Sequence, residues 1–252
     1  MSNEILDVSA LISDTQKTLG LNCIAGKNGL NRAVKSFELQ RPGLIIAGYI
    51  NNMPVYRIQV IGEYEAAYLE SLSSDKRKEN FRHMISFDIP CIIFAKNIEP
   101  PAEFIELGDE RNFPVITTRV STYKLISALG DYLEDKFAPK TVMHGAMVDV
   151  HGVGILFRGK SGIGKSECAL DLIARGHRLV ADDYVVIKKR SDDILMAMSK
   201  EHMGHFMEIR GMGIIDIEKL FGIRAVRMQK RVELCVKLVP WDDINDYERI
   251  GD

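Results

Sequence analysis

Residues 159–166 read GKSGIGKS and match the pattern GxxxxGK[ST] through Gly159, Gly164, Lys165 and Ser166. Glycines let the backbone curl so that successive N–H groups point at one anion, and the start of a helix adds partial positive charge. The lysine of such a loop reaches the outer phosphates, and the serine hydroxyl ligates Mg²⁺. The stretch therefore predicts a phosphate-binding loop. The alternative interpretation is a glycine-rich turn with a surface lysine.

The flanking sequence supplies the strand and the helix that this motif requires. GVGILFRG, directly before it, alternates apolar residues as a strand does. KSECALDLIAR, directly after it, predicts a helix with Ala169, Leu172 and Ile173 on its apolar side. Gly176 then stands where a glycine commonly ends a helix. This context favours the phosphate-binding loop over the flexible turn.

A pair of carboxylates follows in RLVADDYVVI, which reads as the next strand. Neighbouring side chains on a strand point to opposite faces, so Asp182 and Asp183 should differ in role unless the strand breaks between them. One could face a Mg²⁺–phosphate centre while the other meets the acceptor, since a carboxylate can orient and deprotonate an acceptor hydroxyl. The alternative is a solvated acidic pair at a strand end.

Other polar residues are less specific on their own. The segment EIRGMGIIDI, residues 208–217, predicts a charged strand end, a glycine turn and an apolar strand. His144, upstream of the loop, and Arg249, near the C-terminus, could be structural or functional. His202 and His205 are three residues apart, but no further ligand completes a convincing metal set, so we interpret them as structural.

Bulk properties exclude several classes of function. The 252 residues carry a formal net charge of −2, so no overall positive field would attract nucleic acid or an anionic membrane. The four cysteines form no CxxC pair, which favours reduced thiols in a cytosolic protein over a zinc site or a disulfide framework. The N-terminus lacks a signal-peptide pattern, and no apolar run could span a bilayer. We expect a soluble cytoplasmic protein that binds neither nucleic acid nor membrane.

The chain predicts two domains of α/β class. In the first half, ILDVSALISDTQK and most of EYEAAYLESLSSDKRKENFRHM read as helices, while YRIQVIG, FDIPCIIFAK and FPVITTR read as strands. STYKLISALGDYLEDKFAPK predicts one more helix, ended by Pro139. We place the boundary near residue 130, with an N-terminal α/β domain at 1–130, for assembly or regulation, and a catalytic domain at 131–252.

The stretches GKSGIGKSE, RGHRLVADD and EIRGMGIIDIEKLFG resemble the HPr kinase/phosphorylase family of bacteria, closely over 142–252 and more loosely before. The resemblance implies a bifunctional enzyme. With ATP and Mg²⁺ it phosphorylates a serine of the carrier protein HPr, and with inorganic phosphate it removes that phosphate as pyrophosphate. It also implies a homohexamer, and a P-loop kinase domain similar to the nucleotide core of phosphoenolpyruvate carboxykinases.

The resemblance also implies the roles of individual residues. Asp183 accepts the serine proton in phosphorylation and returns a proton in the reverse reaction. The catalytic residues are His144, Lys165, Asp183 and Arg249. The nucleotide-binding residues are Gly159, Lys160, Ser161, Gly162, Ile163, Gly164, Lys165 and Ser166. The metal ligands are Ser166 and Glu208, and the supporting residues are Asp182, Arg210, Gly211 and Gly213.

The sequence departs from the family pattern in three places. Lys160 replaces an acidic residue that the family often has, which adds positive charge beside the phosphates. FGIRAV replaces the more usual FGAGAV, so Arg224 enters a small-residue turn. The chain is also expected to lack the family's C-terminal segment, which holds a loop tied to the phosphorylase reaction and helices that help bind HPr and build the hexamer.

Two other functions fit the same loop and carboxylates. One is a carboxykinase-like enzyme that transfers a phosphoryl group to or from a small organic acid, although no basic pocket for such an acid can be identified in the sequence. The other is a nucleotide-binding regulator without catalytic activity. Phosphoryl transfer to an HPr-like protein distinguishes the kinase from both.

Overall fold

The computed structural model describes residues 6–49, 56–190, 193–200 and 204–241, and the chain forms two compact units, Met1–Phe137 and Ala138–Asp252. The boundary expected near residue 130 falls within helix α6 (Thr122–Phe137), which belongs to the first unit.

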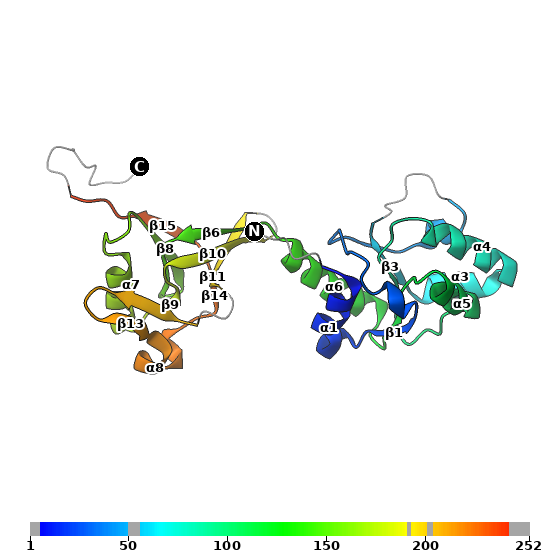
Figure 1. Cartoon of the computed structure of the whole chain (residues 1–252), viewed down its shortest axis with the longest axis horizontal. Helices are drawn as coiled ribbons and strands as arrows, with labels where there is room; N and C mark the ends of the chain where they lie inside the picture. The colour runs from blue at the N-terminus through cyan, green and yellow to red at the C-terminus, as the bar shows by residue number, and fades with distance from the viewer. Residues whose placement is uncertain (1–5, 50–55, 191–192, 201–203, 242–252) are drawn as a thin grey trace. The chain divides into compact units, whose positions relative to one another are not determined.

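The first unit contains a five-stranded sheet in the order β1-β5-β4-β3-β2 (Figure 1). Its strands are β1 (Asn22–Ala25), β2 (Leu39–Gln40), β3 (Ile58–Ile61), β4 (Ile92–Phe94) and β5 (Val115–Thr117). β2 to β5 are parallel to one another, and β1 is antiparallel to β5. The strands predicted in YRIQVIG, FDIPCIIFAK and FPVITTR are confirmed as β3, β4 and β5.

Helices cover both faces of this sheet. They are α1 (Val8–Leu19), η1 (Lys27–Gly29), α2 (Gly43–Ile46), α3 (Glu63–Ser71), α4 (Ser74–Ile85), α5 (Ala102–Glu110) and α6. Leu11 of α1 and Leu129 of α6 pack on one face, whereas Phe81 of α4 and Phe104 of α5 pack on the other. Burial on both faces explains why the strand sequences are continuously apolar. The expected α/β class is confirmed for this unit.

The segment predicted to be helical after β3 is two helices. α3 ends where Leu72 is extended (ψ 152°), and Ser73 caps α4 by accepting a hydrogen bond from the Lys76 N–H at 3.3 Å. Serine is a preferred N-cap residue because its hydroxyl satisfies an N–H group that lacks a partner in the helix.

The second unit contains two four-stranded sheets and a separate hairpin. The first sheet, in the order β14-β11-β10-β6, consists of β6 (Lys140–His144), β10 (Tyr184–Arg190), β11 (Ile194–Ser199) and β14 (Gln229–Arg231). The second, in the order β15-β8-β7-β9, consists of β7 (Ala146–Val150), β8 (Val153–Arg158), β9 (Arg178–Ala181) and β15 (Leu234–Lys237). The hairpin pairs β12 (Phe206–Ile209) with β13 (Gly213–Asp216).

These elements pack in three layers (Figure 1). Met147 and Leu156 of one sheet pack against Val185 and Ala197 of the other. The opposite face of the β7–β8 sheet is covered by α7 (Lys165–Ala174), by the β12–β13 hairpin and by α8 (Ile217–Phe221), which η2 (Ile223–Ala225) follows. This unit is also mixed α/β, and its middle sheet holds both the phosphate-loop helix and the second sheet in place.

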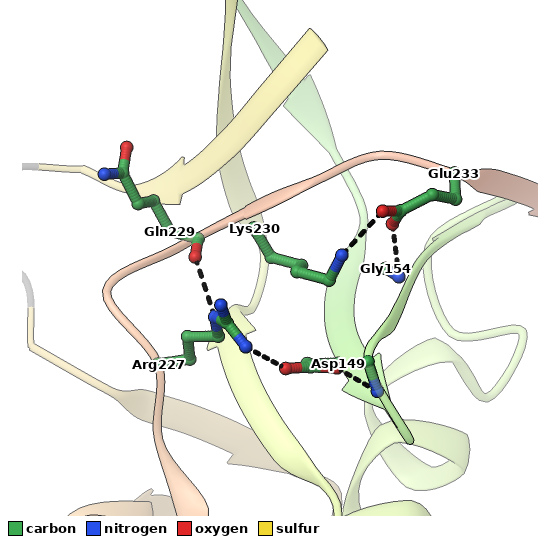
Figure 2. Close-up of polar contacts among 7 residues, drawn as sticks. Asp149, Gly154, Arg227, Gln229, Lys230 and Glu233 are labelled. Carbon is green, nitrogen blue, oxygen red and sulfur yellow. Dashed lines mark hydrogen bonds and ion pairs between the residues drawn. The ribbon is translucent and has the colours of Figure 1, made fainter. Parts of the chain in front are cut away.

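A polar network holds residues 227–233, the segment that leads into β15 of the β7–β8 sheet (Figure 2). The Arg227 guanidinium donates to the buried carboxylate of Asp149 at 2.6 Å, and Asp149 also accepts from the Gly152 N–H at 2.8 Å. Glu233 accepts from the Gly154 N–H at 2.5 Å and from Lys230 at 2.6 Å. These bonds attach the segment before β15 to the β7–β8 hairpin.

None of the helices in the described part of the chain is long and apolar enough to cross a membrane.

The ion pair between Arg77 of α4 and Glu103 of α5 should stabilise the first unit in a pH-dependent way. The two groups lie 2.8 Å apart, Glu103 is buried, and the Arg77 hydrogen bond lowers the pKa of Glu103 from its ordinary 4.5 to about 2. Because the folded-state pKa lies below the unfolded one, the stabilisation is complete above about pH 4.5 and is lost as the pH falls towards 2.

We therefore expect Glu103→Gln to lower the free energy of unfolding at pH 7 by about 2 kcal/mol, and by clearly less at pH 3, in urea denaturation followed by circular dichroism. Glu106→Gln is the matched control, because Glu106 makes only an exposed ion pair with Lys78 at 3.3 Å and should change stability by less than about 0.5 kcal/mol. Equal effects of the two variants, or a Glu103→Gln effect independent of pH, would contradict the assignment.

Candidate functional site

The predicted phosphate loop connects β8 to α7. The strand predicted in GVGILFRG is confirmed as β8, and the helix predicted in KSECALDLIAR is confirmed as α7. Gly162 (φ 77°) and Gly164 (φ 101°) adopt left-handed backbone conformations that favour glycine. Gly164 is the N-cap of α7, and no side chain caps the helix there. The first N–H groups of α7 therefore point towards the loop without a side-chain acceptor.

Lys165 folds back across this loop. Its side chain is buried, and its Nζ donates hydrogen bonds to the carbonyl oxygens of Gly159 at 3.2 Å and Lys160 at 2.9 Å. Both acceptors are neutral carbonyls, so they orient the ammonium without cancelling its charge. The lysine thus holds the first two residues of the loop, and its own ammonium group places a positive charge beside them.

The strand predicted through the two aspartates breaks at that point. β9 ends at Ala181 and β10 begins at Tyr184, and Asp183 has a left-handed backbone (φ 61°), which aspartate tolerates better than most residues. β9 and β10 belong to different sheets, so the chain changes sheet at Asp182–Asp183. The alternation of a continuous strand therefore does not apply to the pair.

Asp182 lies against the start of α7. The Ser166 hydroxyl donates to Asp182 Oδ1 at 3.1 Å, while Asp182 Oδ2 is buried and has no hydrogen-bond partner among the described residues. Burial, followed by the neighbouring charge of Asp183, raises the pKa of Asp182 to about 6. A buried carboxylate oxygen without a donor is a suitable environment for a cation.

His144 holds the Asp183 turn. His144 is the last residue of β6, and its Nδ1 lies 3.0 Å from the Asp183 carbonyl oxygen and 3.9 Å from the Asp183 carboxylate. The Gly145 N–H donates to the same carbonyl at 3.1 Å. A Cβ at Gly145 would lie 2.6 Å from the Phe157 carbonyl oxygen, so only glycine fits this close approach. The histidine and the aspartate are therefore positioned together by the backbone.

A pocket of about 250 Å³ joins these elements. It is lined by His144, Ser161, Gly162, Gly164, Lys165, Ser166, Glu167, Asp183, Glu208 and Arg210. Glu208 and Arg210 come from the β12–β13 hairpin, which packs beside α7. The Arg210 guanidinium lies directly on Gly162, because a Cβ at Gly162 would be 1.9 Å from Arg210 Nη2.

Several residues proposed from the sequence lie outside the lining. Gly159 and Lys160 act through their carbonyl oxygens on Lys165, and Asp182 reaches the pocket through Ser166. Ile163 belongs to the loop without lining the pocket. Gly211 (φ 80°) and Gly213 (φ 88°) form the turn after β12 that carries Arg210. Arg249 lies outside the described residues.

Glu167 lines the pocket, although no role was predicted for this residue. Its place directly after Ser166, in the first turn of the predicted helix, was a signal that could have identified it. Among the described residues, no group of three or more histidine, cysteine, aspartate or glutamate side chains forms a metal cluster.

The pocket combines two kinds of chemistry. The backbone N–H groups at the start of α7, Lys165 and Arg210 suit a chain of phosphates. The lining also includes the carboxylates of Asp183 and Glu208 and the imidazole of His144, which can hold a cation or move a proton. This arrangement is suited to phosphoryl transfer to or from a hydroxyl group.

Comparisons with known proteins agree with this chemistry. The model of the HPr Serine kinase N terminus matches residues 6–133, and the model of the HPr Serine kinase C-terminal domain matches residues 135–252.

This chain belongs to the HPr serine kinase family.

It is 45% identical over 220 residues to the HPr kinase/phosphorylase of Prosthecochloris aestuarii, covering 87% of this chain and 65% of that protein. It is 41% identical to the HPr kinase/phosphorylase of Bacillus cereus, covering 92% of this chain and 75% of the relative. It is 39% identical to the HPr kinase/phosphorylase of Geobacter sulfurreducens, covering 100% of this chain and 79% of that relative.

Among solved structures, the Hpr(Ser) kinase/phosphatase from Coxiella burnetii is 35% identical, covering 42% of this chain and 67% of that one, with a TM-score of 0.37.

The contact between Gly162 and Arg210 makes a testable prediction. Gly162→Ala should displace the Arg210 guanidinium and strain the loop, which has φ 77° at this residue. We expect pyrophosphate to bind this variant about tenfold more weakly or worse in calorimetry, because strain of this kind costs about 1–3 kcal/mol. Gly130→Ala is the control, since a Cβ there meets open space on α6, and binding should not change. Unaltered binding by Gly162→Ala would contradict the proposed packing.

Proposed function

We propose that this protein is an HPr serine kinase/phosphorylase, which transfers the terminal phosphoryl group of ATP to a serine of an HPr-type carrier protein. In the reverse direction it uses inorganic phosphate to remove that group as pyrophosphate. The observation that carries the proposal is the single pocket in which the phosphate loop, Asp183 and His144 lie together. The names of the curated relatives, several of them aligned over most of this chain, support the same activity.

The domain assignment follows from this activity. The second unit is the catalytic P-loop kinase domain, of the type found in the nucleotide core of phosphoenolpyruvate carboxykinases. The first unit serves assembly or regulation. The protein acts in the cytoplasm as a homo-oligomer, a hexamer by family resemblance, and its protein partner is HPr or a relative of HPr.

The nucleotide phosphates bind along the loop formed by residues 159–166. Its N–H groups and the start of α7 supply donors, and Lys165 supplies a positive charge. Lys165 is already oriented by Gly159 and Lys160, so little reorganisation is needed when the phosphates arrive. Arg210 closes the loop at Gly162 and contributes a second cation that can bind phosphate oxygens in a bidentate manner.

The residues around Ser166 fit a magnesium ion. The buried Asp182 Oδ2 has no donor among the described residues, and the Ser166 hydroxyl is held at 3.1 Å from Asp182 Oδ1. Ser166 and Glu208 are the proposed ligands, with Asp182 orienting the serine. Oxygen ligands of this kind are preferred by Mg²⁺. When bound, the ion would neutralise charge on the transferred phosphoryl group.

Asp183 is the proposed proton acceptor. Its side chain is 41% exposed in the pocket, so an incoming serine hydroxyl can reach the carboxylate. The left-handed turn and the two hydrogen bonds to its carbonyl fix the direction of the side chain. His144 Nδ1 lies 3.9 Å from the Asp183 carboxylate. We propose that this histidine positions Asp183 and provides a polar group where the acceptor serine binds.

The same carboxyl group serves the reverse reaction. As the serine oxygen attacks the terminal phosphorus, its proton passes to Asp183 and the bond to ADP breaks. In phosphorolysis, a phosphate oxygen attacks the phosphoserine phosphorus, and protonated Asp183 returns its proton to the leaving serine oxygen, as microscopic reversibility requires. The phosphate loop then holds the attacking phosphate and the pyrophosphate product. Arg249 is proposed as a further catalytic residue on family resemblance alone.

The first test is phosphoryl transfer from labelled ATP to purified HPr in the presence of Mg²⁺. We expect Asp183→Asn to reduce transfer by about 10²–10⁴-fold without weakening ATP binding, since a positioned general base contributes about that much. Asp171→Asn is the matched control, because Asp171 lies on the exposed side of α7 and pairs only with Arg175. No transfer to any HPr-like protein, with ATP still bound, would favour the non-catalytic regulator, and transfer to a small organic acid would favour the carboxykinase-like enzyme.

The second test concerns the metal ligands. Glu208→Gln should raise the Mg²⁺ concentration needed for half-maximal transfer by about tenfold or more, because it removes one ligand charge. Glu218→Gln makes the same chemical change on exposed α8 and should leave the Mg²⁺ dependence unaltered. If Glu208→Gln lowered the rate equally at every Mg²⁺ concentration, Glu208 would have a role other than metal binding.

A further inference from the structure

A second pocket, larger than the catalytic one, lies at the opposite end of α7. It measures about 380 Å³ and is lined by Asp149, His151, Gly152, Gly176, His177, Arg178 and Arg227. None of these residues lines the catalytic pocket. A ten-residue helix is about 15 Å long, so α7 separates the two sites.

Two turns bring the histidines of this pocket together. α7 ends in a turn in which the Gly176 N–H donates to Ile173 and the His177 N–H donates to Leu172, with Gly176 at φ 93°. His151 forms the tight turn between β7 and β8 with a left-handed backbone (φ 50°), which is unusual for a residue other than glycine. The two imidazole rings meet edge to face, with centroids 4.5 Å apart.

Among the described residues that line the pocket, two are arginines and one is acidic. The acidic residue, Asp149, is buried and already accepts hydrogen bonds from Arg227 and the Gly152 N–H (Figure 2). Arg178 is exposed and makes no side-chain hydrogen bond or ion pair with the described residues. The Arg227 side chain is 41% exposed, and its Nε donates to the Gln229 carbonyl oxygen at 3.1 Å. The Asp149 carboxylate offsets the charge of Arg227, so Arg178 is the lining guanidinium whose charge no described carboxylate offsets, and the two imidazoles line the same space.

We propose that this pocket binds a small anion bearing a phosphate group, either free phosphate or a phosphate monoester. Arg178 and the N–H groups of Arg227 that Asp149 and Gln229 leave open are the charged donors, and the ring nitrogens of His151 and His177 are further hydrogen-bonding partners. Planar guanidinium groups match phosphate oxygens in a bidentate geometry.

The same residues disfavour a metal ion. Two histidines alone supply only two ligands, the one carboxylate is held by Arg227, and two arginines would repel a cation. The carboxyl end of α7 does not exclude an anion, because its carbonyl oxygens at Asp171, Leu172 and Ile173 accept hydrogen bonds from the turn that follows.

The test uses the full chain and the ring C–H resonances of its histidines in NMR, at constant pH and with chloride as the ionic-strength control. Inorganic phosphate and glycerol 3-phosphate are titrated separately, which distinguishes free phosphate from a monoester. We expect the His151 and His177 resonances to shift saturably. His144 reports separately on the catalytic pocket, and in Lys165→Ala its shift should be lost while those of His151 and His177 remain.

Arg178→Ala should weaken the binding seen at His151 and His177 by about tenfold or more, because a charge-assisted hydrogen bond is lost. Arg175→Ala is the matched control, since Arg175 lies close by in the sequence, outside the pocket, and pairs with Asp171. The proposal is wrong if neither anion gives saturable shifts at His151 and His177, if Arg178→Ala leaves them unchanged, or if Lys165→Ala abolishes them. A failure of phosphoryl transfer to HPr would leave this result unaffected.

Discussion

The second unit depends on two adjacent places where the chain passes from one sheet to the other. β6 and β10 belong to one sheet, and β7 and β9 belong to the second. The first crossing is at Gly145 and the other at Asp182–Asp183, and they are joined because the Gly145 N–H and His144 Nδ1 both contact the Asp183 carbonyl oxygen. Each crossing requires backbone geometry that most residues do not tolerate. The proposed catalytic side chains are therefore placed by the same turns that connect the sheets.

The second unit also removes charged groups from water at this site. The Lys165 side chain is buried with carbonyl oxygens as its hydrogen-bond partners, and the partly buried Asp182 accepts a hydrogen bond from a serine hydroxyl. Desolvation of a charged group is costly, and at Asp182 it raises the pKa of the carboxyl group to about 6. A polyphosphate at Lys165 and a cation near Asp182 would relieve both costs. The site is therefore organised to bind ligands at the expense of the stability of the free protein.

Local patterns in the sequence predicted much of this arrangement. The strand, glycine loop and helix around Lys165 are contiguous, so their residue pattern contains the necessary information. The break between Asp182 and Asp183 was not predicted, because it depends on the distant Gly145 and His144. The approach of Arg210 to Gly162 likewise depends on how the β12–β13 hairpin packs beside α7. Pairings of this kind are set by tertiary packing, which residue spacing does not encode.

The second pocket illustrates the same limit. His151 and His177 lie in separate turns, and their sequence neighbours give no indication that they meet. They come together because β7 pairs with both β8 and β9, which places the β7–β8 turn beside the segment that enters β9 from α7. The start of α7 leaves its N–H groups without a side-chain cap, whereas its end is capped by its own turn. One helix therefore offers backbone donors at the phosphate loop, while at its other end only side chains remain to recognise a ligand.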